Sequence, residues 1–383
     1  MGPLSAGITR LYGRRGWTVL GACAAILFVL FPLANLALPN GSLLYVSDYT
    51  VALTGKIMCY AIVAIAMDLI WGYTGILSLG HGLFFALGGY AMGMYLMRMI
   101  GREGQYQSDL PDFMVFLDWK AYPWYWSYTD HFWYAALLVV LVPGLLAFVF
   151  GYFAFRSRIK GVYFSIITQA LTFAFMLLFF RNDTGFGGNN GFTDFKRILE
   201  FPISTSETRM ALFMVTGAAL IATLLFARFI VTSKLGRVLT AIRDAESRVM
   251  FSGYNPVHYK LFIWTVSAVI CGIAGALYVP QVGIINPSEM SPANSIEIAI
   301  WVALGGRGSL VGAILGAGIV NGAKSVLTVA FPEYWLFFLG LTFILATLFL
   351  PNGVVGAYAQ VREKLQARKA AQATAAANAT EGA

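Results

Sequence analysis

"WYAALLVVLVPGLLAFVFGYFAF", Trp133 to Phe155, contains no charged residue. A helix needs about 20 mostly apolar residues to cross the hydrocarbon core of a bilayer, so this run predicts a membrane span. Barrel strands are shorter and alternate in polarity, so the spans are expected to be helices. Similar runs predict spans at Trp17 to Leu38, Val51 to Ile70, Ile76 to Met97, Gly161 to Phe180, Met210 to Ile230, Leu261 to Val282 and Tyr334 to Leu350.

The composition agrees with a polytopic membrane protein of the all-α class. Of the 383 residues, 58% are hydrophobic and only 11% are charged, about half the charged share of a soluble domain. The first run follows three arginines, as in a signal peptide, but it is too long and lacks a small-residue cleavage site. We therefore expect it to remain as the first span.

One further apolar segment, Ile296 to Val329, is interrupted by "GGRGS" at Gly305 to Ser309. If this broken, glycine-rich segment is a hairpin, the chain has about ten transmembrane helices. If it is re-entrant, the chain has about eight. Both counts place the two termini on the same side of the membrane.

The charges indicate which side that is. Cytoplasmic loops carry an excess of lysine and arginine, so the net charge of +8 reflects orientation and gives no reason to expect nucleic acid as a partner. We expect a cytoplasmic N-terminus at 1–16, a transmembrane domain at 17–350 with a cytoplasmic loop at 232–259, and a cytoplasmic, disordered tail at 351–383. The basic residues that would share this face include Arg10, Arg14, Arg15, Arg156, Arg158, Lys160, Lys234, Arg237, Arg243, Arg248, Lys260, Arg362, Lys364, Arg368 and Lys369.

The loop at 232–259 contains a charged amphipathic stretch, "GRVLTAIRDAESRVMFSGYN", at Gly236 to Asn255. Its apolar residues have helical spacing, with Ser233 as a plausible N-cap and Gly253 as a plausible C-cap. Two interpretations of this short helix are open. It could lie on the lipid surface with its basic residues toward anionic headgroups, or it could fit a groove on a partner protein.

The same stretch resembles the cytoplasmic coupling loop of ABC-importer permeases of the branched-chain amino acid type. The resemblance also covers "DLIWGYTGILSLGHGLFFALGGYAMGMYLM" at Asp68 to Met97 and "ALGGRGSLVGAILGAGIVNGAKS" at Ala303 to Ser325. It implies that the loop docks on an ATP-binding subunit. The coupling residues it implies are Gly236, Arg237, Ala241, Arg243, Asp244, Glu246 and Gly253.

Within that family, "RNDTGFGGNNGFTDF" at Arg181 to Phe195 and a tryptophan-rich loop before it look most like the second permease subunit of bacterial urea ABC transporters. This resemblance implies urea as the substrate, with branched-chain amino acids or short amides as the alternative. It also implies a multi-pass protein of the bacterial inner membrane. The implied partners are a second homologous permease, two ATP-binding subunits and a periplasmic substrate-binding protein.

The chain is not expected to hydrolyse ATP itself. A phosphate-binding loop needs a lysine directly after its last glycine, and the nearest match, "GIVNGAKS" at Gly318 to Ser325, has Ala323 in between. No cofactor is therefore expected on this chain, and ATP and Mg would be used by the partner subunits. The scattered histidines and the three cysteines show no catalytic or metal-ligand spacing, so neither an enzyme nor a metal site is predicted.

An ion-coupled secondary transporter is the rival class, because broken glycine-rich helices occur there too. Such a transporter would need charges inside its core, and few are available. Lys56 and Asp68 are expected to reach the two interfaces from one span, and Arg307 to face the cytoplasm. Glu297 has apolar neighbours on both sides, so a position at a membrane interface does not account for it. Lys324 is the remaining charged residue within or near a predicted span.

A small neutral solute would need amides, hydroxyls and backbone groups along its path. Ordinary hydrogen bonding between helices is the alternative role for such groups. The candidates for the substrate path are Ser78, Thr168, Gln169, Asn189, Asn190, Asn286, Asn294 and Glu297.

Overall fold

The computed structural model describes residues 12–39, 41–42, 44–349, 353–358, 360–363 and 366. Its long helices are α2 (Arg14–Ala25), α3 (Asp48–Thr74), α4 (His81–Arg98), α6 (Phe132–Arg156), α7 (Val162–Phe180), α8 (Ser206–Thr232), α9 (Lys234–Phe251), α10 (Pro256–Val282), α11 (Pro292–Gly305), α12 (Leu310–Ala330) and α13 (Trp335–Phe349). The π-helical segments η1 (Ile26–Leu30) and η2 (Leu33–Ala37) continue α2.

The remaining elements are short. They are η3 (Gly101–Glu103), α5 (Asp112–Phe116), η4 (Trp124–Trp126), η5 (Asn182–Thr184), η6 (Gly188–Asn190), η7 (Pro287–Met290), β1 (Phe192–Thr193), β2 (Arg197–Ile198), β3 (Phe201–Pro202) and β4 (Ile284–Ile285). Two antiparallel pairs form, with Phe192 opposite Ile285 and Arg197 opposite Pro202.

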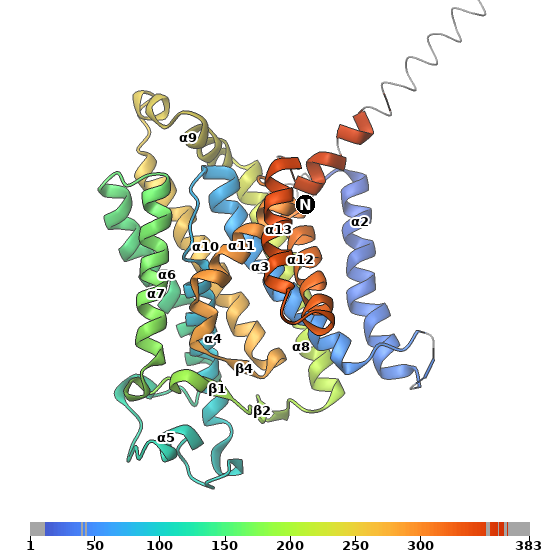
Figure 1. Ribbon diagram of the computed structural model, residues 1–383, viewed down its shortest axis with the longest axis vertical. Helices are drawn as coiled ribbons and strands as arrows, with labels where there is room; N and C mark the ends of the chain where they lie inside the picture. The colour runs from blue at the N-terminus through green and yellow to red at the C-terminus, as the bar shows by residue number, and fades with distance from the viewer. Residues whose placement is uncertain are drawn as a thin grey trace, which may run out of the picture.

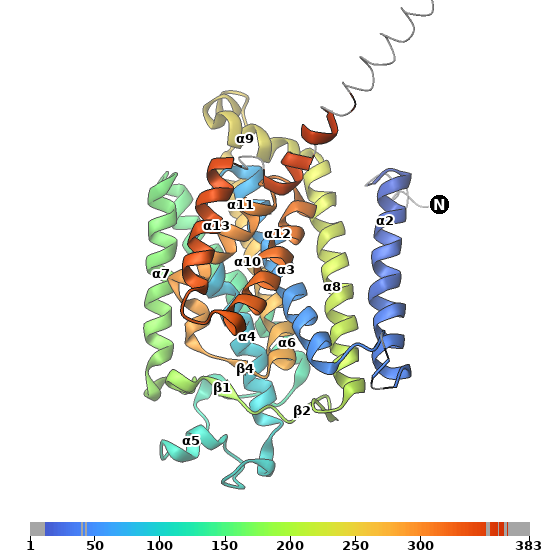
Figure 2. The same cartoon turned by 45° about the vertical axis from the view of Figure 1, so that its right-hand side comes forward.

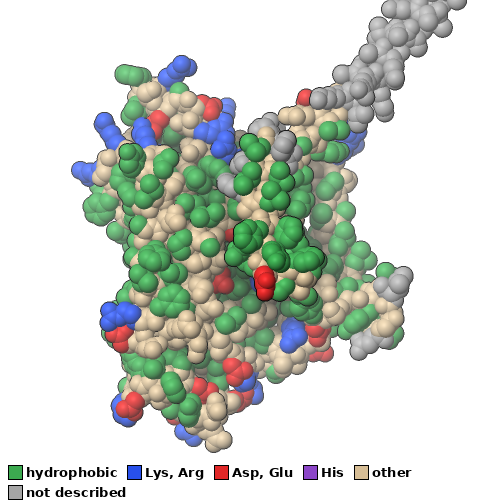
Figure 3. Space-filling model, viewed as in Figure 1, with side chains coloured by type: hydrophobic (Ala, Val, Ile, Leu, Met, Phe, Trp, Pro, Cys, Tyr) green, Lys and Arg blue, Asp and Glu red, His purple; other side chains and the backbone are tan. Residues whose placement is uncertain are grey.

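The predicted fold class is confirmed. Among the described residues, seven helical segments are long and apolar enough to cross a membrane, and the shorter helices α4, α11 and α13 complete the bundle. The long helices lie side by side, with α9 at one end and α5, β1 and β2 at the other (Figures 1 and 2). We call these the α9 end and the α5 end. Basic side chains gather near α9, whereas hydrophobic side chains dominate the middle of the face in Figure 3.

The tail is only partly described. Residues 353–358 and 360–363 are helical, whereas 351–352, 359, 364–365 and 367–383 lie outside the described residues, as do residues 1–11 at the other terminus. The disorder predicted for 351–383 therefore stays a prediction over most of that range, and helix replaces it where the tail is described.

One predicted span begins too early. Residues 76–80 are not helical, and α4 begins at His81 rather than at Ile76. Gly75 ends α3 with φ of +74°, and side chains of α7 then hold the extended residues that follow. The Thr168 hydroxyl accepts a hydrogen bond from the Leu79 amide at 3.1 Å, and the Ser165 hydroxyl donates to the Leu77 carbonyl at 2.8 Å.

The centre of the bundle is formed by α3, α4 and α10, which pack closely because of small residues. A Cβ on Gly88 would lie 2.0 Å from the Gly272 carbonyl oxygen, and one on Gly275 would lie 1.9 Å from the Phe85 carbonyl oxygen. Neither position has room for a side chain. Glycines at such contacts let two helix backbones approach each other directly.

The break at Gly305 to Ser309 is confirmed, because α11 ends at Gly305 and α12 begins at Leu310. The two helices pack against each other as a hairpin. The turn needs glycine, since φ is +121° at Gly306 and +79° at Gly308. With 14 residues, α11 rises about 21 Å, less than the hydrocarbon thickness of about 30 Å.

The turn of this hairpin is held by α3. The Asp68 carboxylate accepts a hydrogen bond from the Gly308 amide at 2.7 Å, and the Tyr73 hydroxyl donates to the Gly308 carbonyl at 2.9 Å. Asp68 is fully buried, so the expectation that it reaches the bilayer interface is wrong. A buried carboxylate needs a donor, and the backbone amide of Gly308 at the break supplies one.

Candidate functional site

The amphipathic helix predicted in the 232–259 loop is α9, which joins α8 to α10 at the α9 end. Its predicted N-cap is confirmed, because the Ser233 hydroxyl accepts from the Gly236 amide at 3.4 Å. The helix ends at Phe251, and Gly253 follows with φ of +85°, donating to the Met250 carbonyl at 3.0 Å. Gly253 therefore terminates the helix, as predicted.

The expectation of one continuous helix is wrong, because α9 is kinked at Ala245, where φ is −158° and ψ is 77°. The kink places the Glu246 carboxylate between two lysines, 2.8 Å from Lys160 Nζ and 2.7 Å from Lys260 Nζ. Lys260 is buried in α10. Glu246 therefore fastens α9 to α10 and to the turn between α6 and α7.

This double ion pair sets the protonation of Glu246. Burial raises the pKa of the carboxyl group, but hydrogen bonds from Lys160 and Lys260 outweigh burial, so the pKa lies below its ordinary value. The carboxylate is charged and satisfied within the chain, with only 20% of its side chain exposed. It is not free to pair with another protein unless these bonds break.

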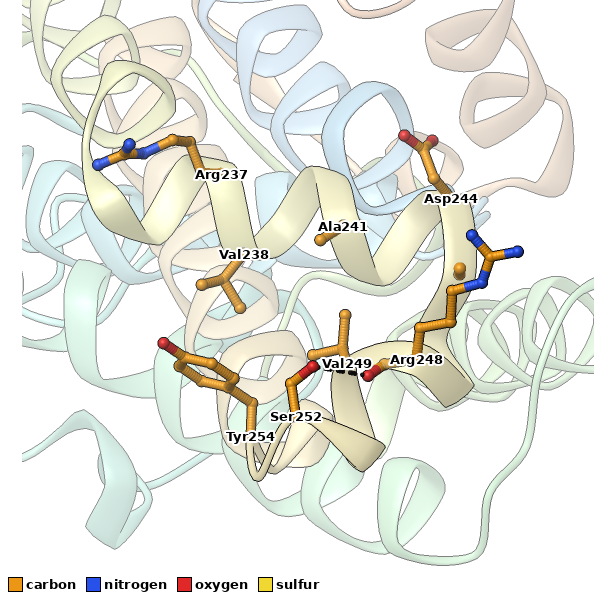
Figure 4. Close-up of a pocket in the computed structure, with 9 residues that line it drawn as sticks. Arg237, Val238, Ala241, Asp244, Arg248, Val249, Ser252 and Tyr254 are labelled. Carbon is orange, nitrogen blue, oxygen red and sulfur yellow. Dashed lines mark hydrogen bonds between the residues drawn. The ribbon is translucent and has the colours of Figure 1, made fainter.

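The outer side of α9 forms a concave surface. A cavity of about 390 Å³ lies between the two arms of the kinked helix and the turn that follows. Figure 4 shows Val238, Ala241 and Val249 on its apolar surface, with charged side chains around them. We call this surface the α9 groove, lined by Arg237, Val238, Ala241, Asp244, Ala245, Arg248, Val249, Ser252 and Tyr254.

The coupling residues implied by the sequence divide into two groups. Arg237, Ala241 and Asp244 line the α9 groove, whereas Gly236, Arg243 and Glu246 contact the body of the bundle. A Cβ on Gly236 would lie 2.0 Å from the Val231 carbonyl oxygen. Gly253 lies in the turn after the helix, where an added Cβ would meet no neighbouring atom.

Arg243 connects α9 to the end of α3. Its Nη1 donates to the Gly72 carbonyl at 2.8 Å and its Nε to the Asp244 carboxylate at 2.9 Å. Gly72 lies one turn from Asp68, which holds Gly308 at the break. A continuous set of contacts therefore runs from α9 through α3 to the α11–α12 turn.

The candidates for the substrate path do not meet at one place. Ser78 and Thr168 come together beside the start of α4, where both hydroxyls bind backbone groups. Gln169 is half-buried next to Thr168. Ser78 and Thr168 therefore fit the alternative role, in which such hydroxyls hold helices and loops together.

The four asparagines lie in two separate turns. Asn189 and Asn190 are exposed in η6, and Asn190 borders a cavity of about 320 Å³ with Asp112 and Asp194. Asn286 and Asn294 hold the η7 turn. Their side chains bind the Ser288 amide at 3.0 Å and the Ser288 carbonyl at 2.9 Å.

Glu297 has a partner that the sequence did not indicate. Its Oε2 lies 2.8 Å from Nζ of Lys324, which is 27 residues further along the chain on the facing helix α12. Lys324 also lies over the Trp335 ring at 4.8 Å. The Glu297 side chain is 5% exposed, and its Oε1 has no hydrogen-bond partner among the described residues.

Two more charges complete this group. Lys56 Nζ of α3 lies 5.8 Å from the centroid of the Tyr60 ring, and that ring packs against Trp301, one turn after Glu297, and against Tyr278. The Tyr278 hydroxyl donates to Glu289 at 3.3 Å. We call Lys56, Glu289, Glu297 and Lys324 the intramembrane charge cluster. Sequence reasoning treated Lys56, Glu297 and Lys324 one by one and did not single out Glu289. The signal that could have found the cluster is that two lysines and a glutamate stand inside apolar segments.

A bundle of membrane-spanning helices with an amphipathic helix at one end and charges inside it defines a multi-pass membrane protein. A family comparison agrees. Residues 49–347 match the model of the branched-chain amino acid transport system permease component. The chain belongs to this family of ABC-transporter permeases.

Individual relatives include LivM and LivH permeases. The high-affinity branched-chain amino acid permease LivM of Salmonella typhimurium is 25% identical over 348 residues, 85% of this chain and 74% of the relative. LivH of the same bacterium is 23% identical over 310 residues, 78% of this chain and 91% of the relative. A probable LivM of Methanocaldococcus jannaschii is 25% identical over 312 residues, which are 77% of this chain and 90% of the relative. No solved structure is significantly similar.

Proposed function

We propose that this chain translocates branched-chain amino acids as one permease subunit of an ATP-driven importer in a bacterial inner membrane. The observation that carries the proposal is the family match over residues 49–347, together with relatives named for branched-chain amino acid transport. These relatives support the alternative substrate of the sequence analysis better than urea. Similarity to both LivM and LivH supports pairing with a second, homologous permease.

The α9 groove is the proposed docking site for an ATP-binding subunit. It combines an apolar surface with Arg237, Asp244 and Arg248, which suits a partner helix better than a flat lipid surface. With the partner permease, two such subunits would bind and would use the ATP and Mg. This assignment makes the α9 end cytoplasmic, in agreement with its basic residues, and places both termini there.

The α5 end is then periplasmic and would receive substrate from a binding protein. Its loops carry opposite charges at the surface, including pairs between Arg102 and Asp109 and between Arg197 and Glu103. Rim charges of this kind guide association more than they add affinity. The cavity bordered by Asn190 lies on the same surface.

Urea remains the second candidate because of one observation. The two segments that resemble urea permeases contact each other at the α5 end, where Trp126 packs edge-on against Phe192 with ring centroids 5.5 Å apart. These segments belong to the α5 end, which would receive substrate. They would therefore determine which binding protein docks there.

The experiment compares uptake of labelled leucine and labelled urea in the source bacterium, in a deletion strain and in the complemented strain. Branched-chain transport requires leucine uptake to fall in the deletion strain and to return on complementation, while urea uptake stays unchanged. The opposite pattern would establish urea as the substrate and would refute the amino-acid proposal.

A further inference from the structure

We propose that the intramembrane charge cluster binds the zwitterionic head group of an amino acid on its way across the membrane. This inference rests on the function proposed above and assigns it a site. The cluster contains two lysines and two glutamates, from α3, η7, α11 and α12. A free amino acid carries one ammonium and one carboxylate, so it needs one anion and one cation in its site.

The anionic part of the site is Glu297. Its Oε2 is occupied by Lys324, whereas its buried Oε1 accepts no hydrogen bond from the described residues. An unsatisfied carboxylate oxygen is costly in a buried position. The ammonium of a substrate would supply the missing donor.

The cationic part is Lys56. It is half-buried, and its ammonium makes no hydrogen bond within the described part of the chain, although it lies 5.8 Å from the Tyr60 ring centroid. Tyr60 in turn packs against Tyr278, whose hydroxyl donates to Glu289. A substrate carboxylate could bind Lys56 while the substrate ammonium binds Glu297.

The surroundings suit an aliphatic amino acid. A cavity of about 130 Å³ lies between α11, α12 and α13 and is bounded at one point by Lys324. Its wall is almost entirely apolar. Aliphatic side chains form much of that wall, namely Leu304, Ile319, Val320, Leu327 and Leu339. A branched side chain could enter this cavity while the head group stays among the charges.

A purely structural ion pair is the competing explanation, and a double variant separates the two. Replacing a buried ion pair by neutral residues of similar volume is often tolerated, whereas removing one partner is not. The test therefore uses Glu297→Gln combined with Lys324→Met. A second variant, Lys56→Met, removes only the proposed cation, and Lys56→Arg restores a positive charge.

Ser325→Ala is the matched control. This residue follows Lys324 on α12, and its hydroxyl bonds only the Asn321 carbonyl of its own helix, at 2.9 Å. Removing that hydroxyl leaves no buried donor without a partner. Membrane insertion and co-purification with the partner subunits are measured for every variant, together with the maximal rate of leucine uptake.

If the site binds a zwitterion, the double variant and Lys56→Met assemble normally but lose maximal uptake by about tenfold to a hundredfold, because hydrogen bonds to charged groups are strong. Lys56→Arg recovers part of the rate, and Ser325→Ala is normal. Normal uptake by either Lys56→Met or the double variant overturns the site and leaves the proposed function intact. If the double variant does not assemble, Lys56→Met decides alone. Absence of leucine uptake in the wild-type complex overturns the proposed function itself.

Discussion

The guanidinium of Arg243 donates a 2.8 Å hydrogen bond to the backbone carbonyl of Gly72. The bond joins α9, the helix of the proposed docking site, to the last turn of α3, which holds the α11–α12 break through Asp68 and Tyr73. An ATP-binding subunit that moves α9 would therefore pull directly on α3. The turn between α11 and α12, which α3 holds, would then move as well.

Arg243→Ala should weaken this connection without preventing docking, because Arg243 points away from the α9 groove. We expect substrate uptake to fall by about tenfold, the effect of losing one charge-assisted hydrogen bond, while ATP hydrolysis by the assembled complex continues. Uptake and ATP hydrolysis are measured on the same preparation. Lys234→Ala, an exposed basic residue on the same helix, serves as the control, and equal loss in both variants would argue against a specific role of Arg243.

Arg237→Glu tests the α9 groove as a docking surface. Arg237 is exposed and makes no ion pair within the described part of the chain, so the substitution should leave folding unchanged and reduce recovery of the ATP-binding subunits on co-purification several-fold. Charge reversal at an interface typically costs several kcal/mol. Undiminished recovery with normal uptake would support the alternative in which α9 lies on lipid.

Glu246 should make stability depend on pH. Because its pKa in the folded protein is lowered from the ordinary value of 4.5, its contribution is complete above that value and is lost as the pH falls through the folded pKa. Glu246→Gln should therefore lower the unfolding temperature at pH 7 more than at pH 4, measured in detergent by intrinsic fluorescence. An equal effect at both pH values would show that the charge of Glu246 does not stabilise α9.

Asp68 should be required for the break between α11 and α12. Asp68→Asn keeps an oxygen that can accept from the Gly308 amide, whereas Asp68→Leu leaves that amide without its partner at a cost of about 1 to 3 kcal/mol. We expect near-normal uptake for the asparagine variant and a strong reduction for the leucine variant, with membrane levels determined in parallel. Normal uptake by Asp68→Leu would contradict the account of the turn.

The helices were predictable from sequence because their cause is local. Apolar runs long enough to span a bilayer define α6 and α10, and capping residues such as Ser233 and Gly253 act on their own neighbours. The exceptions depend on tertiary contacts. Residues 76–80 read as the start of a span, but hydrogen bonds from α7 stabilise them as an extended segment. The kink at Ala245 is likewise accompanied by tertiary contacts, the ion pairs of Glu246 with Lys160 and Lys260.

The candidate site was predictable only in part for the same reason. The amphipathic helix α9 could be predicted because its residues are consecutive. Glu297 stood out as a charge among apolar residues, but its pairing with Lys324 and its proximity to Lys56 depend on how α3, α11 and α12 pack. Ser78 and Thr168 looked like path residues because a hydroxyl that binds a solute and one that binds backbone have the same sequence signature.

The most direct test of the central claim is uptake of leucine into proteoliposomes that contain the purified permease complex, with the binding protein on one side and ATP on the other. The account predicts accumulation of leucine only when the ATP-binding subunits and ATP are both present, with no uptake driven by a proton gradient alone. Gradient-driven uptake by this chain without the ATP-binding subunits would instead identify an ion-coupled transporter and would contradict the account.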